Sequence, residues 1–180
     1  TMESQCLQVM VEGLECNPTC DLAHCLLQII DEEGRPSEKR WDDFFYNRYY
    51  GKLLHEWHIR KAPHDGWLHF LGVTAYTSLT QMLFRKRLFD ELGFFREDFG
   101  SIADYEWCMR VSMRRDTLHV PFRLASWRVH EQQATNESAM KKAMSRGQFL
   151  KMAQMAVKGL GDGLRPSGMD KSDLWSLLER

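Results

Sequence analysis

Ten mostly apolar residues at positions 21–30, DLAHCLLQII, limit the possible folds of this chain more than any other segment. A run so rich in Leu and Ile predicts a buried strand. The residues after it, DEEGRP, supply Gly34 and Pro36 and predict a tight turn. Before it, apolar residues of segment 3–15 recur at helical spacing until the Asn-Pro pair at 17–18 ends the pattern. A helix, a buried strand and a turn therefore open the chain and favour an α/β (or α+β) fold.

The rest of the chain predicts further helices and strands from its apolar periodicity. In chain order we first predict a helix over 41–61, interrupted at Gly51, and then a strand and a short helix within 69–93, the helix ending at Gly93. Two strands follow at 117–122 and 125–131, separated by a turn near 121–124, and a helix follows over 137–158. Together they predict a small mixed sheet flanked by helices. Residues 1–135 form the predicted domain, and residues 136–180 form a C-terminal helical tail.

The composition excludes several classes of protein. With 24 Lys and Arg against 25 Asp and Glu, the net charge of −1 gives no overall attraction for nucleic acid. Five cysteines, an odd number, fit free thiols in a reducing compartment better than a disulfide framework. No segment approaches the roughly 20 apolar residues that span a bilayer. We therefore expect a cytoplasmic domain that is at most peripheral to a membrane.

Two segments carry possible metal ligands. The first contains Cys16, Cys20, His24 and Cys25. These are ligand types that zinc prefers, but no Cys-x-x-Cys pair is present, so we favour core or surface thiols. The second, HEWH at 55–58, puts two histidines on one predicted helix face without the spacing of the zinc-protease motif. There we expect a surface or half-buried pair.

The stretch FGSIADYEWCMRVSMRRD at 99–116 predicts a helix that begins after a turn of small residues. Ser101 and Asp104 have the spacing of a capping box, in which side chains satisfy free N–H groups at a helix start. An acid at a junction of loop and helix is also placed to act as a general base. The residues of this stretch alone leave both interpretations open.

The segments around this stretch, taken in order, resemble the C-terminal half of the family 2 glycosyltransferases, which have the GT-A fold. In that family an R-x-x-F-x-x-x-G-x-F segment precedes a loop, an acidic pair that opens a helix with a later arginine, a Pro-containing strand and an R-x-H triplet. The matching residues are Arg87 to Phe94, Asp104, Arg110, Pro121 and Arg128-Val129-His130. The upstream GLECNPTCDLAHCLLQIIDEEGRP is similar to the family's helix, Asn-Pro turn, strand and hairpin tip. The resemblance covers residues 3–135 and implies a partial GT-A-like domain.

What the resemblance implies is transfer of a sugar, with inversion, from a nucleotide-sugar donor to an acceptor hydroxyl in polysaccharide or glycolipid synthesis. Asp104 matches the base that removes the hydroxyl proton. The expected substrate-binding residues are Trp107, Arg110 and Arg128, and the expected metal ligand is His130, near the donor phosphates. A divalent metal, Mg²⁺ or Mn²⁺, would neutralise the departing diphosphate in the full-length enzyme. The alternative is structural: the two arginines form salt bridges and the histidine ends a strand.

The chain departs from the family pattern in two places. Ala103 stands where the family has the first acid of its pair, so we expect a different acceptor geometry. The family's N-terminal half, with the Asp-x-Asp that holds the metal, has no counterpart here. Together with the Thr1-Met2 start, this predicts the acceptor-side part of a larger enzyme, inactive in isolation, whose uncovered surface would favour a homo-oligomer.

A second hypothesis is a degenerate, non-catalytic module that binds a saccharide or a protein. Its aromatic candidates are Trp41, Tyr49 and Trp57, which would stack on sugar rings, although aromatic residues at this density more often form core.

The basic and apolar residues of segment 138–158 allow two interpretations as well. They fit peripheral contact with an anionic membrane, where a lipid-linked acceptor would lie. Packing of the apolar residues on the domain's own core explains the same periodicity, and we favour it.

Overall fold

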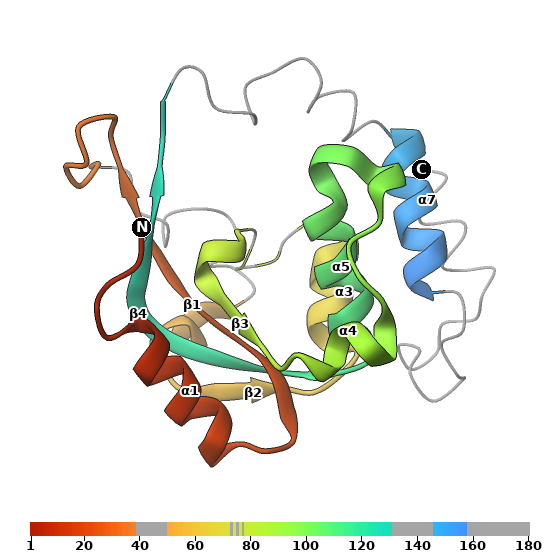
Figure 1. Ribbon diagram of the computed structural model, residues 1–180, viewed down its shortest axis with the longest axis horizontal. Coiled ribbons are helices and arrows are strands. Elements are labelled where there is room, and N and C mark those ends of the chain that lie inside the picture. Colours follow the sequence, from red (N-terminus) through yellow and green to blue (C-terminus); the bar gives the residue numbers. More distant parts are fainter. Residues whose placement is uncertain (39–49, 73, 75, 77, 131–145, 158–180) are drawn as a thin grey trace.

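The computed structural model describes residues 1–38, 50–72, 74, 76, 78–130 and 146–157. Its centre is a four-stranded mixed sheet in the order β2-β4-β1-β3 (Figure 1). The long inner strands, β1 (Cys20–Ile30) and β4 (Asp116–Arg128), are parallel. The short edge strands, β2 (His58–Arg60) and β3 (Met82–Phe84), are each antiparallel to their neighbour. The fold is α/β, as the sequence predicts.

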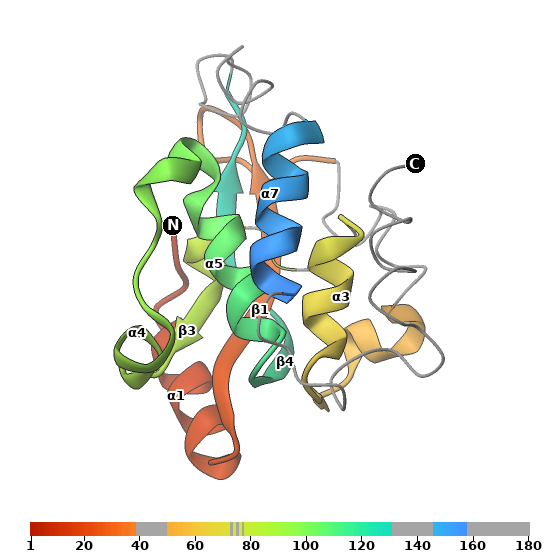
Figure 2. The same cartoon turned by 90° about the vertical axis from the view of Figure 1, so that its right-hand side faces the viewer.

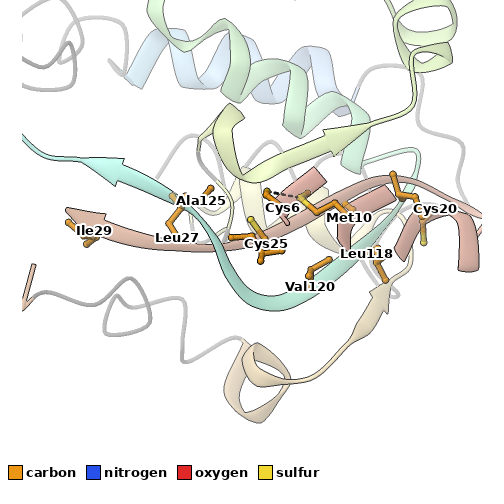
Figure 3. Packing of buried hydrophobic residues seen from close by; sticks show 12 residues of the cluster. Cys6, Met10, Cys20, Cys25, Leu27, Ile29, Leu118, Val120 and Ala125 are labelled. Carbon is orange, nitrogen blue, oxygen red and sulfur yellow. Dashed lines mark hydrogen bonds between the residues drawn. The ribbon is translucent and has the colours of Figure 1, made fainter. Parts of the chain in front are cut away.

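The apolar run at 21–30 forms β1, which is buried on both faces. Cys25 and Leu27 pack in the core under α1 (Cys6–Cys16), whereas Leu22 and Leu26 pack in the cores on the other face (Figure 3). A strand covered on both faces reads as a continuous apolar run, because neither face meets water. The predicted buried strand is therefore confirmed.

The predicted opening helix is confirmed as α1. Its buried residues Met10 and Leu14 pack on β1 and β4, and a Cβ atom at Gly13 would lie 3.0 Å from Leu118 Cδ2. The helix ends where predicted, since the backbone N–H of Asn17 bonds Leu14 O and its side-chain amide bonds Gly13 O. The turn after β1 is also confirmed, with Gly34 at a φ of 87°.

The opposite face of the sheet is covered by α3 (His64–Phe70), α4 (Arg87–Leu92), α5 (Ala103–Ser112) and α7 (Arg146–Val157) (Figures 1 and 2). Met152, Ala153 and Ala156 of α7 are buried against the core that α5 contributes to. The apolar residues of the described part of this basic helix therefore pack on the domain itself. Residues 137–145 and 158–180 of the predicted tail lie outside the described residues. Within the described part of the chain, no helix is long and apolar enough to cross a membrane.

The predictions for segments 41–61 and 69–93 are wrong in detail. The helix expected to continue to residue 61 ends as a 3₁₀ turn, η2 (Gly51–His55), and is followed by β2; residues 41–49 lie outside the described residues. The segment expected to begin as a strand at 69 belongs at first to α3, because tertiary packing overrides its weak local pattern. Its later part is as predicted, with β3, α4 and a Gly93 whose N–H bonds Phe89 O.

The two strands predicted at 117–122 and 125–131 are a single strand. β4 stays paired with β1 from Asp116 to Arg128, and the register shifts beside Leu26 absorb the extra residues around Pro121. A proline has no N–H for the ladder, so it is tolerated at such an irregularity. What looked like a turn is therefore a bulge inside one strand.

Candidate functional site

The predicted catalytic acid lies in the first turn of α5, on the face of the sheet opposite α1. α5 leads back to β4, so its first turn lies toward the carboxyl ends of β1 and β4 (Figure 1). In open α/β sheets, ligands bind outside the carboxyl ends of the strands. Asp104 is in the first turn of α5, and Arg128 and His130 are at the end of β4.

Asp104 is half-buried in the first turn of α5. Its Oδ1 accepts the backbone N–H of Tyr105 at 2.7 Å, and no basic side chain among the described residues pairs with it. Burial raises the pKa of its carboxyl, while the Tyr105 N–H lowers it in part. The predicted capping box is absent, because Ile102, whose side chain is apolar, is the N-cap. Asp104 instead satisfies one free N–H of the helix start, that of Tyr105.

The loop that delivers Asp104 is held by its neighbours on both sides. Phe99 and Ile102 are buried in the core shared with α7, and Gly100 takes a φ of 55° between them. Lys151 of α7 bonds Asp98 at 2.9 Å, at the start of the same loop, η4 (Glu97–Ile102). These contacts fix where the first turn of α5 begins.

Trp107 and Arg110 lie on the same helix as Asp104 but make structural contacts. Trp107 has no exposed surface, and its Nε1 donates to Gly93 O at 2.9 Å. Arg110 forms a bidentate pair with the buried Glu106, at 2.8 and 2.9 Å, and donates to Phe94 O. A fully buried indole offers a substrate no surface. The pair with Glu106 fits the salt-bridge alternative for Arg110, and a substrate role for it stays a prediction. The contacts of Trp107 and Arg110 tie the loop after α4 to α5.

Arg128 and His130 lie at the end of β4, across the top of Figure 1 from α5. Arg128 donates through Nη1 to Asp31 O at 3.1 Å and to Glu32 O, which holds the turn after β1. His130 is half-exposed. A substrate or metal role for this pair stays a prediction.

The described residues do not fit a divalent-metal centre. No group of three or more His, Cys, Asp or Glu side chains among them is arranged to hold a metal ion. In the Cys/His segment, Cys16 is exposed while Cys20 and Cys25 are buried, and the thiols are free. This outcome agrees with the expectation of core and surface thiols.

A second polar site, which the sequence reasoning missed, is buried between β2, β4 and α3. Asp65 is 1% exposed, and its carboxylate accepts from Tyr50 Oη at 3.4 Å and from Thr117 Oγ1. Arg60 Nε lies 3.3 Å from Asp65 Oδ1, and the guanidinium stacks 3.8 Å from the centre of the Tyr50 ring. Burial raises the pKa of Asp65 to about 6, although Thr117, Arg60 and Tyr50 each lower it.

A row of histidines crosses the sheet beside this pair. His58, His119 and His24 are aligned by strand register, with ring centres 4.7 Å and 4.8 Å apart along the row. His119 Nε2 donates to Leu54 O at 2.8 Å, and neither ring nitrogen of His24 has a partner. Burial lowers the pKa of His24 well below its usual value and that of His119 to about 4. These imidazoles are therefore neutral at pH 7.

Two grooves flank β2, and His58 lines both. The first, of about 600 Å³, lies between β2 and α1 and is lined in part by Trp57, Glu12 and Asn17. The second, of about 730 Å³, lies between β2 and α3 and is lined in part by Arg60 and Trp67. The HEWH histidines do not share a helix face, since His58 is in the strand.

Comparison with known proteins identifies no relative of this chain: no family model, no curated protein and no solved structure matches it. The fold and the side-chain geometry are therefore the basis for any functional proposal. A signal for the buried site was present in the sequence, because His24 and His119 each stand between two apolar residues inside a predicted strand.

Proposed function

We propose that this chain forms the acceptor-side part of an inverting glycosyltransferase, in which Asp104 is the general base. The resemblance of residues 3–135 to family 2 glycosyltransferases motivates the proposal. The observation that carries it is the state of Asp104: a half-buried carboxyl with a raised pKa, in the first turn of α5, that pairs with no basic side chain among the described residues.

Such a carboxylate suits removal of a proton from a hydroxyl. Desolvation makes it a stronger base than an exposed aspartate, and the half-exposed position leaves one side open to an acceptor. In the proposed step, the acceptor oxygen bonds the anomeric carbon as the bond from that carbon to the diphosphate oxygen breaks on the opposite face. The hydroxyl proton passes to Asp104, and the electron pair leaves with the diphosphate.

Three residues near Asp104 in the chain or in the fold hold the base in position. Trp107 and Arg110 hold the loop after α4 against α5, and Lys151 holds the loop before it. A divalent metal in the full-length enzyme would offset the charge of the diphosphate. Because the described residues do not form such a centre, no step here depends on one.

The test is Asp104→Asn in the full-length parent protein, measured as release of nucleoside diphosphate from a panel of nucleotide sugars in the presence of saccharide and lipid-linked acceptors. We expect kcat/KM to fall by about 10²–10⁴-fold, which is the usual contribution of a positioned base. Asp90→Asn is the matched control, since that carboxylate is exposed and lies in α4, outside the loop that precedes Asp104. Near-normal transfer by Asp104→Asn would overturn the assignment.

One observation favours the alternative of a non-catalytic saccharide-binding module. Trp57 is 44% exposed, packs edge-on against the exposed Phe122 with ring centres 5.8 Å apart, and lines the first groove with Glu12 and Asn17. An aromatic face beside a carboxylate and an amide suits a sugar ring. Titration with soluble glycans that quenches tryptophan fluorescence in the wild type but not in Trp57→Ala would support this module; an unchanged signal in both would remove it. Trp41 and Tyr49 lie outside the described residues.

A further inference from the structure

We propose that the groove between β2 and α3 binds the phosphate group of a ligand, with Arg60, His64 and Trp67 as its principal contacts. The site is independent of Asp104, and the proposal stands whether or not the chain belongs to a transferase. It rests on the chemistry of the groove wall and on three buried donor nitrogens, of Arg60 and Trp67, that have no hydrogen-bond acceptor.

The described wall of this groove is rich in nitrogen donors and contains no acid. Five side chains with donor or titratable nitrogens line it: His58, Arg60, Lys61, His64 and Trp67. They come from three segments, namely β2, the short connection after it, and α3. The remaining lining, such as Leu53 and Pro63, is apolar. A groove of this composition attracts an anion that carries an apolar or ring-shaped body.

Arg60 is the centre of the site. Its side chain is 6% exposed, its Nε lies 3.3 Å from Asp65 Oδ1, and its Nη1 lies 3.3 Å from His64 Nε2. Neither its Nε nor its Nη2 has a hydrogen-bond acceptor, and the same is true of Nε1 of Trp67. Guanidinium and indole nitrogens can only donate, so no tautomer or rotation supplies the missing acceptors. Buried donors without acceptors are rare in native structures and call for a partner.

His64 closes the groove over the guanidinium. It is exposed, and its ring contacts Arg60 Nη1 through either nitrogen at 3.3 and 3.5 Å. Burial and the charge of Arg60 lower the pKa of His64, so the ring is neutral at pH 7, and its two contacts with Arg60 are long. A swing of this surface side chain opens the guanidinium to the groove. A bound anion then lies between Arg60 and His64 and favours the protonated imidazole.

The arrangement of the donors favours phosphate over carboxylate. A carboxylate accepts in one plane through two oxygens, whereas a phosphate accepts around a tetrahedron through three. The donors here approach from a strand, a loop and a helix, and therefore from several directions. Lys61 adds charge at the mouth of the groove, where it is 70% exposed and pairs with Asp116. The volume of about 730 Å³ leaves room for the rest of a phosphorylated ligand.

The experiment is an NMR titration of the whole chain at fixed ionic strength, which follows the Trp67 indole N–H and the His64 ring protons. The probes are inorganic phosphate, a hexose 1-phosphate and vesicles that contain phosphatidic acid, with acetate as the planar comparison. We expect saturable shifts with phosphate and a rise in the His64 pKa, and only weak, non-saturating shifts with acetate. Tighter binding of the hexose phosphate identifies a soluble ligand, and binding confined to vesicles identifies a lipid.

The variants separate binding from folding. Trp67→Phe removes the indole N–H and keeps a ring, so we expect about three- to tenfold weaker phosphate binding in a folded protein. Lys61→Gln is expected to weaken binding, whereas Lys52→Gln, at an exposed lysine that does not line the groove, leaves it unchanged. Arg60→Lys keeps the positive charge but loses the planar guanidinium with its several N–H donors, and we expect this variant to bind phosphate most weakly. The absence of saturable shifts with all three phosphate probes, or equal affinity of wild type and Trp67→Phe, would overturn the proposal.

Discussion

Two aspartates in this protein share a raised carboxyl pKa and have opposite surroundings. Asp65 is enclosed and meets Arg60, Tyr50 and Thr117, whereas Asp104 is half-buried and meets only a backbone N–H. Burial is the largest cause of the raised pKa in both. Desolvation alone therefore does not identify an acid as functional. A buried carboxylate whose oxygens all have partners supports the fold, and one that lacks partners is available for chemistry.

The largest effect we expect is the loss of stability in Asp65→Asn. Removing the charge leaves Arg60 buried without its anion, which costs about 3–5 kcal/mol for a broken buried pair. Asp104→Asn is the matched change, and its free energy of unfolding should stay within about 0.5 kcal/mol of the wild type, since Asp104 pairs with no charged side chain in the described part of the chain. Urea unfolding of both variants measures the contrast. Equal destabilisation of the two would break it.

Acid should destabilise the buried site. His69 and His119 both have pKa values lowered from 6.5 to about 4, so the unfolded state binds more protons between these values and stability falls as the pH drops from 6.5 to 4. Each histidine contributes about 3 kcal/mol to this loss. The pKa of Asp65 is raised from 3.8 to about 6, so the folded state binds the extra proton below pH 6. This stabilises the folded state and offsets about 3 kcal/mol of the loss from the histidines.

His69, His119 and Asp65 together therefore account for a loss of about 3 kcal/mol in acid, and the lowered pKa of His24 adds to it; urea unfolding at pH 7 and pH 4.5 detects this loss. His119→Gln should weaken the dependence of the free energy of unfolding on pH, whereas His55→Gln, at an exposed histidine, should leave that dependence unchanged. A stability that rises toward pH 4 would contradict the assignment of neutral buried imidazoles.

A smaller effect should follow Trp107→Phe, at the helix of Asp104. The change removes the bond from Nε1 to Gly93 O and part of the packing against Phe89, and we expect about 1–3 kcal/mol of destabilisation. If Trp107 only supports the loop, the sugar transfer that we propose should change mainly through stability, with KM for the acceptor unaltered below the unfolding temperature. A large KM change in a folded variant would instead assign Trp107 to the substrate.

The smallest effect should come from Lys151→Ala. Its ion pair with Asp98 is about half-exposed at both ends, and such pairs contribute up to about 1 kcal/mol. Gln154→Ala, at an exposed position of the same helix, is the control for helix propensity. Thermal unfolding of the two variants checks the prediction. A loss of stability that exceeds that of the control by more than about 1 kcal/mol would show that the Lys151–Asp98 pair is stronger than its exposure suggests.

The sequence predicted the parts of the fold that have strong local patterns. The apolar run of β1, the Asn-Pro end of α1 and the Gly93 end of α4 were all located correctly. The errors fell where local signals are weak: β2 has three residues, and the bulge of β4 contains a proline that reads as a turn. Both are decided by pairing with a distant strand, which no local window contains.

The candidate sites divide in the same way. Asp104 was found from the sequence because a helix start and a family-like order of motifs mark it. The buried site was missed because its members are far apart in the chain and meet only through strand register, which aligns His58, His119 and His24.

The sequence by itself determined the α/β class, the apolar core strand and the position of an acid at a helix start, because periodicity and turn residues act over short distances. The tertiary structure alone decided which acid has partners, that Trp107 is inaccessible, and that Arg60 and Trp67 lie in one groove with unused donors. Burial and charge pairing depend on contacts between remote segments, and a linear sequence does not specify which of its segments will meet.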